Sequence, residues 1–183
     1  MIIGITGSIG AGKGLAASYL VKEKGFQHFS ARALITDEVE RRGLPVNRDT
    51  MTNTANEMRA AGGPAYLFEK LVAAAEAAGG DVVIESVRAI AEVEYLKAHG
   101  GVLLAIDADP EVRYERIVNR GSETDHVTLA QWQAQEAREM HSDDPTKQNV
   151  SAVIALADHV IMNTESVESL QAKLDEFLHV FKR

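Results

Sequence analysis

The sequence contains no cysteine and no long uncharged hydrophobic run. Without cysteine there can be no disulfide framework, no thiolate zinc site and no thiol nucleophile. No uncharged apolar stretch approaches the ~20 residues that a membrane-spanning helix needs. The start of the chain, Met-Ile-Ile-Gly-Ile-Thr-Gly, also lacks the basic region of a signal peptide. We therefore expect a cytoplasmic protein with no membrane partner.

Positive charge is also in short supply. The 19 lysine and arginine residues are outnumbered by 27 aspartate and glutamate residues, so that the formal net charge is −8. This balance argues against a broad, sequence-independent attraction to nucleic acid or to an anionic membrane. Any anionic ligand must instead be met by cations that the fold gathers locally.

The chain length and hydrophobic pattern predict one α/β domain. At 183 residues and 45% hydrophobic content, the chain can bury a sizeable core. Short β-branched runs alternate with longer segments of helical period, which is typical of βαβ units and a parallel sheet. The predicted strands are Ile2–Thr6, Gln27–Ser30, Val82–Glu85, Val102–Asp107 and His159–Met162. The predicted helices are Lys13–Lys24, Ala31–Arg42, Arg48–Ala61, Ala65–Ala78, Ala89–His99, Pro110–Arg120, Thr128–Met140 and Val167–Phe181.

Two stretches interrupt this alternation. Residues 48–78 form two predicted helices joined at Gly62-Gly63-Pro64, and residues 121–150 are polar. We interpret both as inserts over an edge of the sheet within a single domain, residues 1–183.

A phosphate-binding loop follows the first predicted strand. The Walker A pattern Gly-x-x-x-x-Gly-Lys is completed by Gly7, Gly12 and Lys13, directly before a helix. Backbone amides and the helix N-terminus then surround a phosphate, and the lysine adds a point charge. The residues predicted to bind the nucleotide are Gly7, Ser8, Ile9, Gly10, Ala11, Gly12, Lys13, Gly14 and Leu15.

The loop resembles that of adenylate-kinase-type nucleoside monophosphate kinases, Gly-x-Gly-Lys-Gly-Thr, in which a glycine follows the lysine. Here Gly10-Ala11-Gly12-Lys13-Gly14 matches, and Leu15 replaces the usual threonine. A hydroxyl that would line the phosphate site is therefore missing. Ser8, or water alone, would complete the shell of the Mg²⁺ ion.

Two further elements strengthen this resemblance. Glu85 ends a strand and Arg88 lies three residues on, which resembles the Asp-Gly-x-x-Arg segment of the same kinases; Glu85 would organise metal-bound water and Arg88 would hold the acceptor phosphate. The segment 116–120 resembles the Arg-Leu-x-x-Arg that opens the lid of these kinases. Arg113, Arg116 and Arg120 fall on one helical face, where guanidinium groups suit phosphoryl transfer. The alternative is a solvated face paired with neighbouring glutamates, which applies most to Arg113.

The resemblance also assigns the lid and the acceptor region. Residues 121–150 would be a lid that excludes water, with Arg138 as its best placed cation. His126 and His141 show no zinc spacing and receive no role. Residues 31–78 would bind the acceptor through Arg32 and Arg59, the latter placed as in dephospho-CoA-kinase-like proteins, which the whole chain resembles. Asn163 lies in a turn that contacts adenine in those kinases, or is a plain turn residue.

The predicted fold is a three-layer P-loop NTPase fold with a five-stranded parallel sheet. The implied activity is transfer of the γ-phosphoryl group of ATP, with Mg²⁺, to a nucleoside monophosphate or related small nucleotide. The charge would be stabilised by Lys13, Arg116, Arg120 and Arg138, and the acceptor held by Arg32, Arg59 and Arg88. One alternative is hydroxyl phosphorylation of the dephospho-CoA kinase type, for which Asp37 or Glu85 would be the base. The other is a nucleotide-dependent regulatory ATPase or switch. A monomer and a homodimer are both compatible with the sequence.

Overall fold

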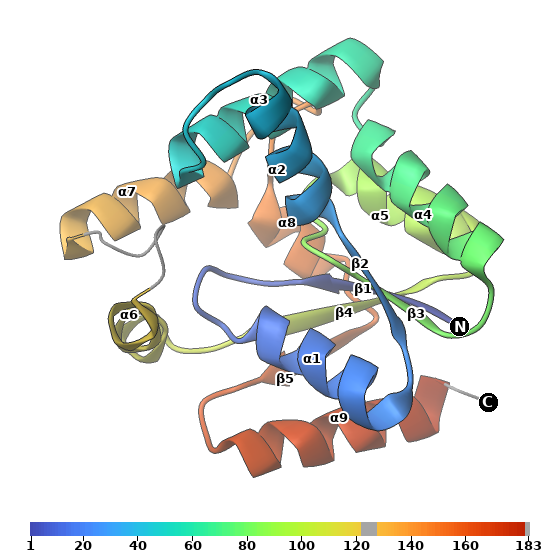
Figure 1. Cartoon of the computed structure of the whole chain (residues 1–183). Coiled ribbons are helices and arrows are strands. Elements are labelled where there is room, and N and C mark those ends of the chain that lie inside the picture. The colour runs from blue at the N-terminus through green and yellow to red at the C-terminus, as the bar shows by residue number, and fades with distance from the viewer. Residues whose placement is uncertain (122–127, 182–183) are drawn as a thin grey trace.

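A parallel sheet forms the centre of the computed structural model, which describes residues 1–121 and 128–181 (Figure 1). The five strands lie in the order β2-β3-β1-β4-β5 and every neighbouring pair is parallel. The predicted sheet is thus confirmed, with each strand at its expected residues. The strands are β1 Ile2–Thr6, β2 Gln27–Ser30, β3 Val82–Glu85, β4 Val102–Asp107 and β5 His159–Met162.

The helices follow the prediction closely, with one addition. The short helix α8 was not predicted, because its six residues fall at the end of a polar stretch. Thr128 caps α7 and Gln131 completes a capping box, so that the helix itself begins one residue later than predicted. The helices are α1 Lys13–Lys24, α2 Ala31–Arg41, α3 Arg48–Gly62, α4 Tyr66–Ala78, α5 Ile90–Ala98, α6 Pro110–Arg120, α7 Leu129–Met140, α8 Val150–Ala155 and α9 Val167–Phe181.

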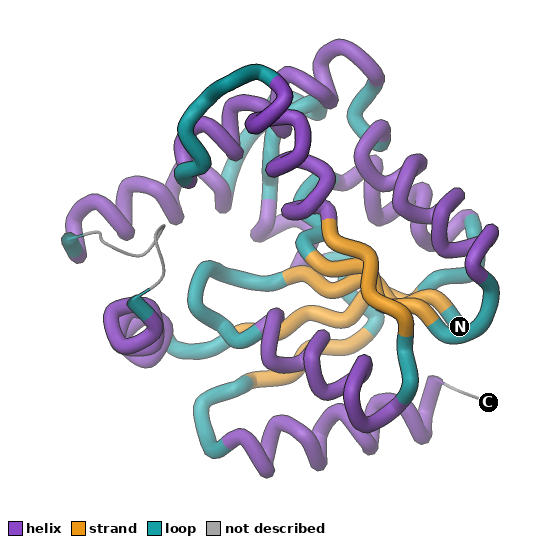
Figure 2. Tube along the Cα trace, in the orientation of Figure 1, coloured by secondary structure: helices purple, strands orange, loops and turns teal. Residues whose placement is uncertain are grey.

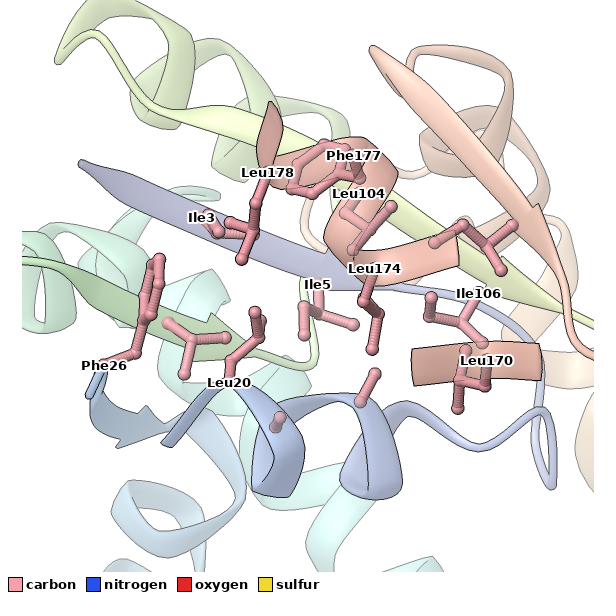
Figure 3. Packing of buried hydrophobic residues seen from close by; sticks show 14 of the residues in the cluster. Ile3, Ile5, Leu20, Phe26, Leu104, Ile106, Leu170, Leu174, Phe177 and Leu178 are labelled. Carbon is pink, nitrogen blue, oxygen red and sulfur yellow. The ribbon is translucent and has the colours of Figure 1, made fainter. Parts of the chain in front are cut away.

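Helices α1 and α9 cover one face of the sheet. Figure 3 shows the core between them, where side chains from β1, β4 and both helices interdigitate. Helix α9 is amphipathic, and the side chains of its apolar stripe are buried in this core. Val167, the first residue of α9, is exposed. The labelled core residues are Ile3, Ile5, Leu20, Phe26, Leu104, Ile106, Leu170, Leu174, Phe177 and Leu178.

The opposite face is covered by α4, α5 and α8. Phe68 and Val72 of α4 and Leu96 of α5 are fully buried in this second core. Val153 of α8 joins them and is also fully buried, so α8 is held by packing on the sheet. Helices α2 and α3 pack beside α4 around a smaller core that includes Val39 and Leu67.

The carboxyl ends of all strands meet at one edge of the sheet, because the strands are parallel. The connections from β1, β3 and β4 leave the sheet at this edge, and α2, α3, α6 and α7 surround it (Figure 2). In open α/β sheets ligands bind outside the carboxyl ends of the strands. The described residues contain no helix that is long and apolar enough to cross a membrane.

Candidate functional site

The loop between β1 and α1 requires glycine for steric reasons. Gly7 has a φ of +138°, and a Cβ atom there would lie 1.8 Å from the carbonyl oxygen of Ile106 on β4. Gly12 has a φ of +102°, and its Cβ would lie 2.4 Å from Nδ2 of Asn163. The glycines of the motif therefore let the loop pass directly against the ends of β4 and β5.

The N-terminus of α1 has no side-chain cap within residues 1–121 and 128–181, and of its first amides that of Leu15 donates to Gly12 O at 3.0 Å. Gly12 is the N-cap residue. The first N–H groups of a helix have no partner within the helix itself. Together with the helix dipole they form a favourable position for an anion such as a phosphate.

Lys13 lies folded back over the loop. Its Nζ donates hydrogen bonds of 2.7 Å to the carbonyl oxygens of both Gly7 and Ser8. Burial, and after it the nearby Arg88 guanidinium, lower the pKa of Lys13 from 10.5 to about 7, against the opposing influence of Glu139 and Glu85. A bound phosphate would raise this pKa again, because nearby negative charge favours the ammonium form.

Arg113 of α6 supports the phosphate loop through hydrogen bonds to backbone carbonyl groups. Arg113 is 5% exposed, and its side chain donates hydrogen bonds to Ala108 O at 2.8 Å and to Ile9 O at 3.2 Å. It also pairs with Glu136 of α7 and lies over the Trp132 ring. The interpretation of Arg113 as part of a solvated face is therefore wrong, because α7 covers it.

Arg116 and Asn163 connect α6, β5 and the loop. Arg116 Nη1 donates to Asn163 O at 2.7 Å, and Asn163 Nδ2 donates to Ala11 O at 2.8 Å. Asn163 is buried, so the contacts that it makes here hold the loop in place. Arg116 and Arg120 line a hollow next to Gly12 and Leu15. The structure thus places both predicted arginines beside the phosphate loop.

A second hollow, which we call the phosphate hollow, opens beside Lys13. Glu85 lines it at the end of β3, where its Oε1 accepts a hydrogen bond from Ser30 Oγ at 3.4 Å and lies 3.6 Å from His28 Nε2. The full lining is Ile9, Gly10, Lys13, Gly14, Arg32, Arg48, Glu85, Ser86, Arg88 and Arg120.

The phosphate hollow offers few protein ligands for a Mg²⁺ ion. In the described part of the chain no group of three or more His, Cys, Asp or Glu side chains could hold a metal ion. Mg²⁺ usually keeps several waters and is bound by one or two carboxylates together with substrate phosphates. Glu85 is the carboxylate of this hollow, and neither Gly14 nor Leu15 offers a hydroxyl. The residues therefore fit an ion held mainly by nucleotide phosphates and water.

An arginine hollow with a cavity volume of about 80 Å³ adjoins the phosphate hollow. Arg32, Arg48 and Arg88, with Ser86, line both hollows, and Arg59 lies in the arginine hollow alone. The three arginines predicted to hold an acceptor, Arg32, Arg59 and Arg88, are thus brought together. The complete lining is Ala31, Arg32, Ile35, Arg48, Met51, Thr52, Ala55, Arg59, Ser86, Arg88, Glu139 and Gln148.

The backbone is strained where the two hollows meet. Ser86 has a φ of 74°, in the left-handed region that non-glycine residues rarely adopt. The amides of Ser86 and Val87 both donate to Ile5 O, at 2.9 and 3.1 Å, which ties this turn to β1. Strain of this kind concentrates at functional sites. In the motif that this segment resembles, a glycine occupies the position of Ser86.

Arg59 is held by a buried ion pair. Arg59 and Glu92 are each 1% exposed, with Arg59 Nη2 and Nε at 2.7 and 2.9 Å from Glu92 Oε1. The other carboxylate oxygen accepts hydrogen bonds from the amides of Arg88 and Ala89. Among the described residues Arg59 Nη1 has no hydrogen-bond partner. Glu92 therefore orients Arg59 and shapes the turn after β3.

Glu139 and Gln148 are site residues that the sequence reasoning missed. Glu139 of α7 is 3% exposed, pairs with Arg88, and has its Oε1 3.8 Å from Arg48 Nη1. Gln148 Oε1 accepts a hydrogen bond of 2.9 Å from Arg88 Nη1. The helical spacing of Trp132, Glu136 and Glu139 was an available signal, since it puts both carboxylates on the side of a buried aromatic ring.

Other predicted residues lie elsewhere. Arg138 is 45% exposed and pairs with Asp49 at 2.7 Å; in the described part of the chain it lines none of these hollows. Asp37 is exposed on α2 and is likewise absent from their linings. His141 is exposed and contacts Ser151. His126 and residues 122–127 of the predicted lid fall outside the described residues.

Known proteins are similar to this chain over most of its length. Residues 3–142 match the family model described as AAA domain. A UPF0200 protein of Methanocaldococcus jannaschii is 31% identical over 182 residues, covering 97% of this chain and 89% of that protein. A UPF0200 protein of Methanococcus vannielii is 32% identical over 186 residues, covering 97% and 94%.

Solved structures show the same fold at lower identity. Shikimate kinase from Aquifex aeolicus superposes with a TM-score of 0.59 at 18% identity, covering 98% of this chain and 97% of that one. A sugar kinase from Janibacter gives a TM-score of 0.58 at 17% identity, covering 98% and 94%. The chain therefore has a P-loop kinase-like fold.

Proposed function

The chain belongs to the AAA domain family and to the UPF0200 proteins, and from this premise we propose that it is an ATP-dependent phosphotransferase whose acceptor is a nucleoside monophosphate or a related small nucleotide. The observation that carries the proposal is that the phosphate hollow and the arginine hollow adjoin and share Arg32, Arg48 and Arg88. A donor phosphate on the loop and an anionic acceptor among the arginines would then meet within one site.

The donor side would work mainly through position and charge. The amides of the loop and of the start of α1 would bind the triphosphate, and Lys13 Nζ would exchange its two backbone carbonyl partners for phosphate oxygens. Arg116 and Arg120 would neutralise charge as it shifts toward the leaving group. When Mg²⁺ is bound with the nucleotide it neutralises further phosphate charge, and Glu85 would hold its water.

The acceptor side would hold an anionic group. Arg32, Arg59 and Arg88 would bind the acceptor phosphate, which is itself the nucleophile, so that no general base is needed. Arg138 was also predicted to stabilise charge. In this role it would first have to leave Asp49, to which it is bonded at 2.7 Å.

A hydroxyl acceptor, as in dephospho-CoA, is less well supported. It requires a carboxylate that can accept the hydroxyl proton. Glu85 and Glu139 are the carboxylates that line the two hollows in the described residues, and both already interact with protein groups. The regulatory switch is the other alternative. It needs no acceptor, and so the arginine hollow would have no use in it.

The test is an assay of acceptor-dependent turnover. Purified protein with ATP and Mg²⁺ is offered separate nucleoside monophosphates and dephospho-CoA, and the phosphorylated products are separated by ion exchange. We expect ADP formation to require one class of monophosphate. ATP hydrolysis that no acceptor accelerates would contradict the proposal.

Two arginines of α2 provide a matched pair of variants. Arg32→Gln removes a cation that lines both hollows, whereas Arg41→Gln removes an exposed cation paired with Glu38. We expect Arg32→Gln to raise the KM for the acceptor at least about tenfold, as for loss of a charge-assisted contact. Arg41→Gln should leave this KM unchanged. Equal effects would indicate a nonspecific influence of charge.

A further inference from the structure

A buried carboxylate inside a cationic hollow needs an explanation. Glu139 lines the arginine hollow and is 3% exposed, although the hollow is otherwise suited to anions. Burial of a carboxylate costs free energy unless it is paired, and a paired charge stabilises a fold no better than apolar packing does. Its contacts are to Arg88 and, at a longer distance, to Arg48.

The effect of Glu139 is to set the net charge of the hollow. Four guanidinium groups line the hollow. Glu92, which is not part of the lining, forms an ion pair with one of them, Arg59, and neutralises its charge. Glu139 is shared by Arg88 and Arg48, and its carboxylate therefore offsets one positive charge of the hollow. Without Glu139 the hollow would carry one more positive charge. A site of higher positive charge attracts polyphosphates more strongly than it attracts a single phosphate group.

We propose that Glu139 is a specificity-determining residue, which keeps di- and triphosphates out of the arginine hollow by limiting its positive charge. The proposal rests on the proposed function, since it takes the arginine hollow as the acceptor site. ATP, the donor, carries the very triphosphate that would otherwise compete there. Discrimination against it would come from an unfavourable charge built into the site.

Glu136 offers an internal comparison on the same helix. It lies one turn before Glu139 and also pairs with an arginine, Arg113, which donates a hydrogen bond to Ile9 O of the phosphate loop. Glu136 does not belong to the lining of the arginine hollow among the described residues. Neutralising Glu136 changes the net charge of the protein by the same amount as neutralising Glu139. It should leave the charge of the arginine hollow unchanged.

The experiment measures the preference between two simple anions. With Mg²⁺ and a non-hydrolysable ATP analogue saturating the phosphate loop, inorganic phosphate and pyrophosphate are titrated by calorimetry at pH 8. Glu139→Gln keeps an oxygen for Arg88 and loses the charge. We expect its affinity for pyrophosphate to rise at least about tenfold more than its affinity for phosphate.

Three controls make the result specific. Glu136→Gln and Glu139→Asp should both keep the wild-type ratio of the two affinities, the latter because it retains the charge. Arg48→Gln lowers the charge of the hollow and should shift the ratio in the opposite direction. This variant decides the question if Glu139→Gln does not fold, as judged by circular dichroism and thermal melting.

The outcomes separate the two levels of the proposal. An unchanged ratio in both Glu139→Gln and Arg48→Gln, with both anions still bound, overturns the role of Glu139 and leaves the proposed function standing. If neither anion binds the wild-type protein in the presence of the ATP analogue, the arginine hollow is not an acceptor site. Both proposals are then overturned.

Discussion

Nucleotide binding should draw a proton onto Lys13. Its pKa of about 7 leaves about nine in ten Lys13 side chains neutral at pH 8 and about one in ten at pH 6 before binding. Phosphate oxygens favour the ammonium form, so the pKa rises in the complex. We expect binding to take up about 0.9 proton at pH 8 and about 0.1 at pH 6, if the bound pKa lies well above 8.

The same linkage predicts how affinity depends on pH. The bound state holds more protons than the free state above pH 7, so affinity falls as pH rises, by up to about tenfold per unit, until the bound pKa is reached. Below pH 7 both states are protonated and this dependence disappears. The sign follows from a free-state pKa that burial has lowered.

Calorimetry in buffers of different ionisation enthalpy measures the proton uptake directly. ATP has an ionisation of its own, so each value is compared with Lys13→Arg, which stays charged, and with Lys13→Met, which has no charge. The difference from wild type isolates Lys13. The reasoning fails if wild type and both variants take up the same number of protons at pH 8.

Three further predictions concern stability and metal binding. Gly7→Ala should lower the free energy of unfolding by about 3 kcal/mol, because its Cβ would lie 1.8 Å from Ile106 O and its φ is +138°. Urea unfolding measures this loss, and a value below about 1 kcal/mol would show that the loop relaxes. Gly14→Ser should fold at least as stably as wild type, because no described atom lies within 4 Å of its Cβ, and serine is about 0.5 kcal/mol better than glycine in a helix. It should also tighten Mg²⁺-dependent ATP binding several-fold, and equal tightening without Mg²⁺ would rule out a metal contact. Glu92→Ala should lower the free energy of unfolding by about 3–5 kcal/mol, because it leaves Arg59 buried without its partner. The double variant Glu92→Ala with Arg59→Met should recover much of that stability in thermal unfolding.

The order and bounds of the elements were largely predictable. Short apolar strands and periodic helices are local patterns, and the capping box at Thr128 and the proline at the start of α6 are local signals as well. Helix α8 was not predictable in the same way. Its six residues are too few for a clear period, and Val153 is buried only because the sheet lies beneath it.

The phosphate loop could be predicted from the sequence more completely than the arginine hollow. The loop is one contiguous segment, and its neighbours β1 and α1 were both recognisable. The hollow combines side chains from α2, α3, α7 and the turn after β3. Three of its arginines were predicted from a family resemblance, whereas Glu139 and Gln148 lie in a polar stretch, where the one signal of burial was the helical spacing of Glu139 from Trp132.

The sequence by itself therefore determined the parallel α/β sheet, the helices that flank it and a phosphate-binding loop from Gly7 to Lys13. These depend on backbone conformation and hydrophobic period, which are properties of neighbouring residues. Only the tertiary structure decided that Arg113 braces the loop, that Arg138 pairs with Asp49 and that Glu139 enters the hollow. The energy of a charged side chain depends on its burial and on partners far away in the sequence, and the fold alone sets both.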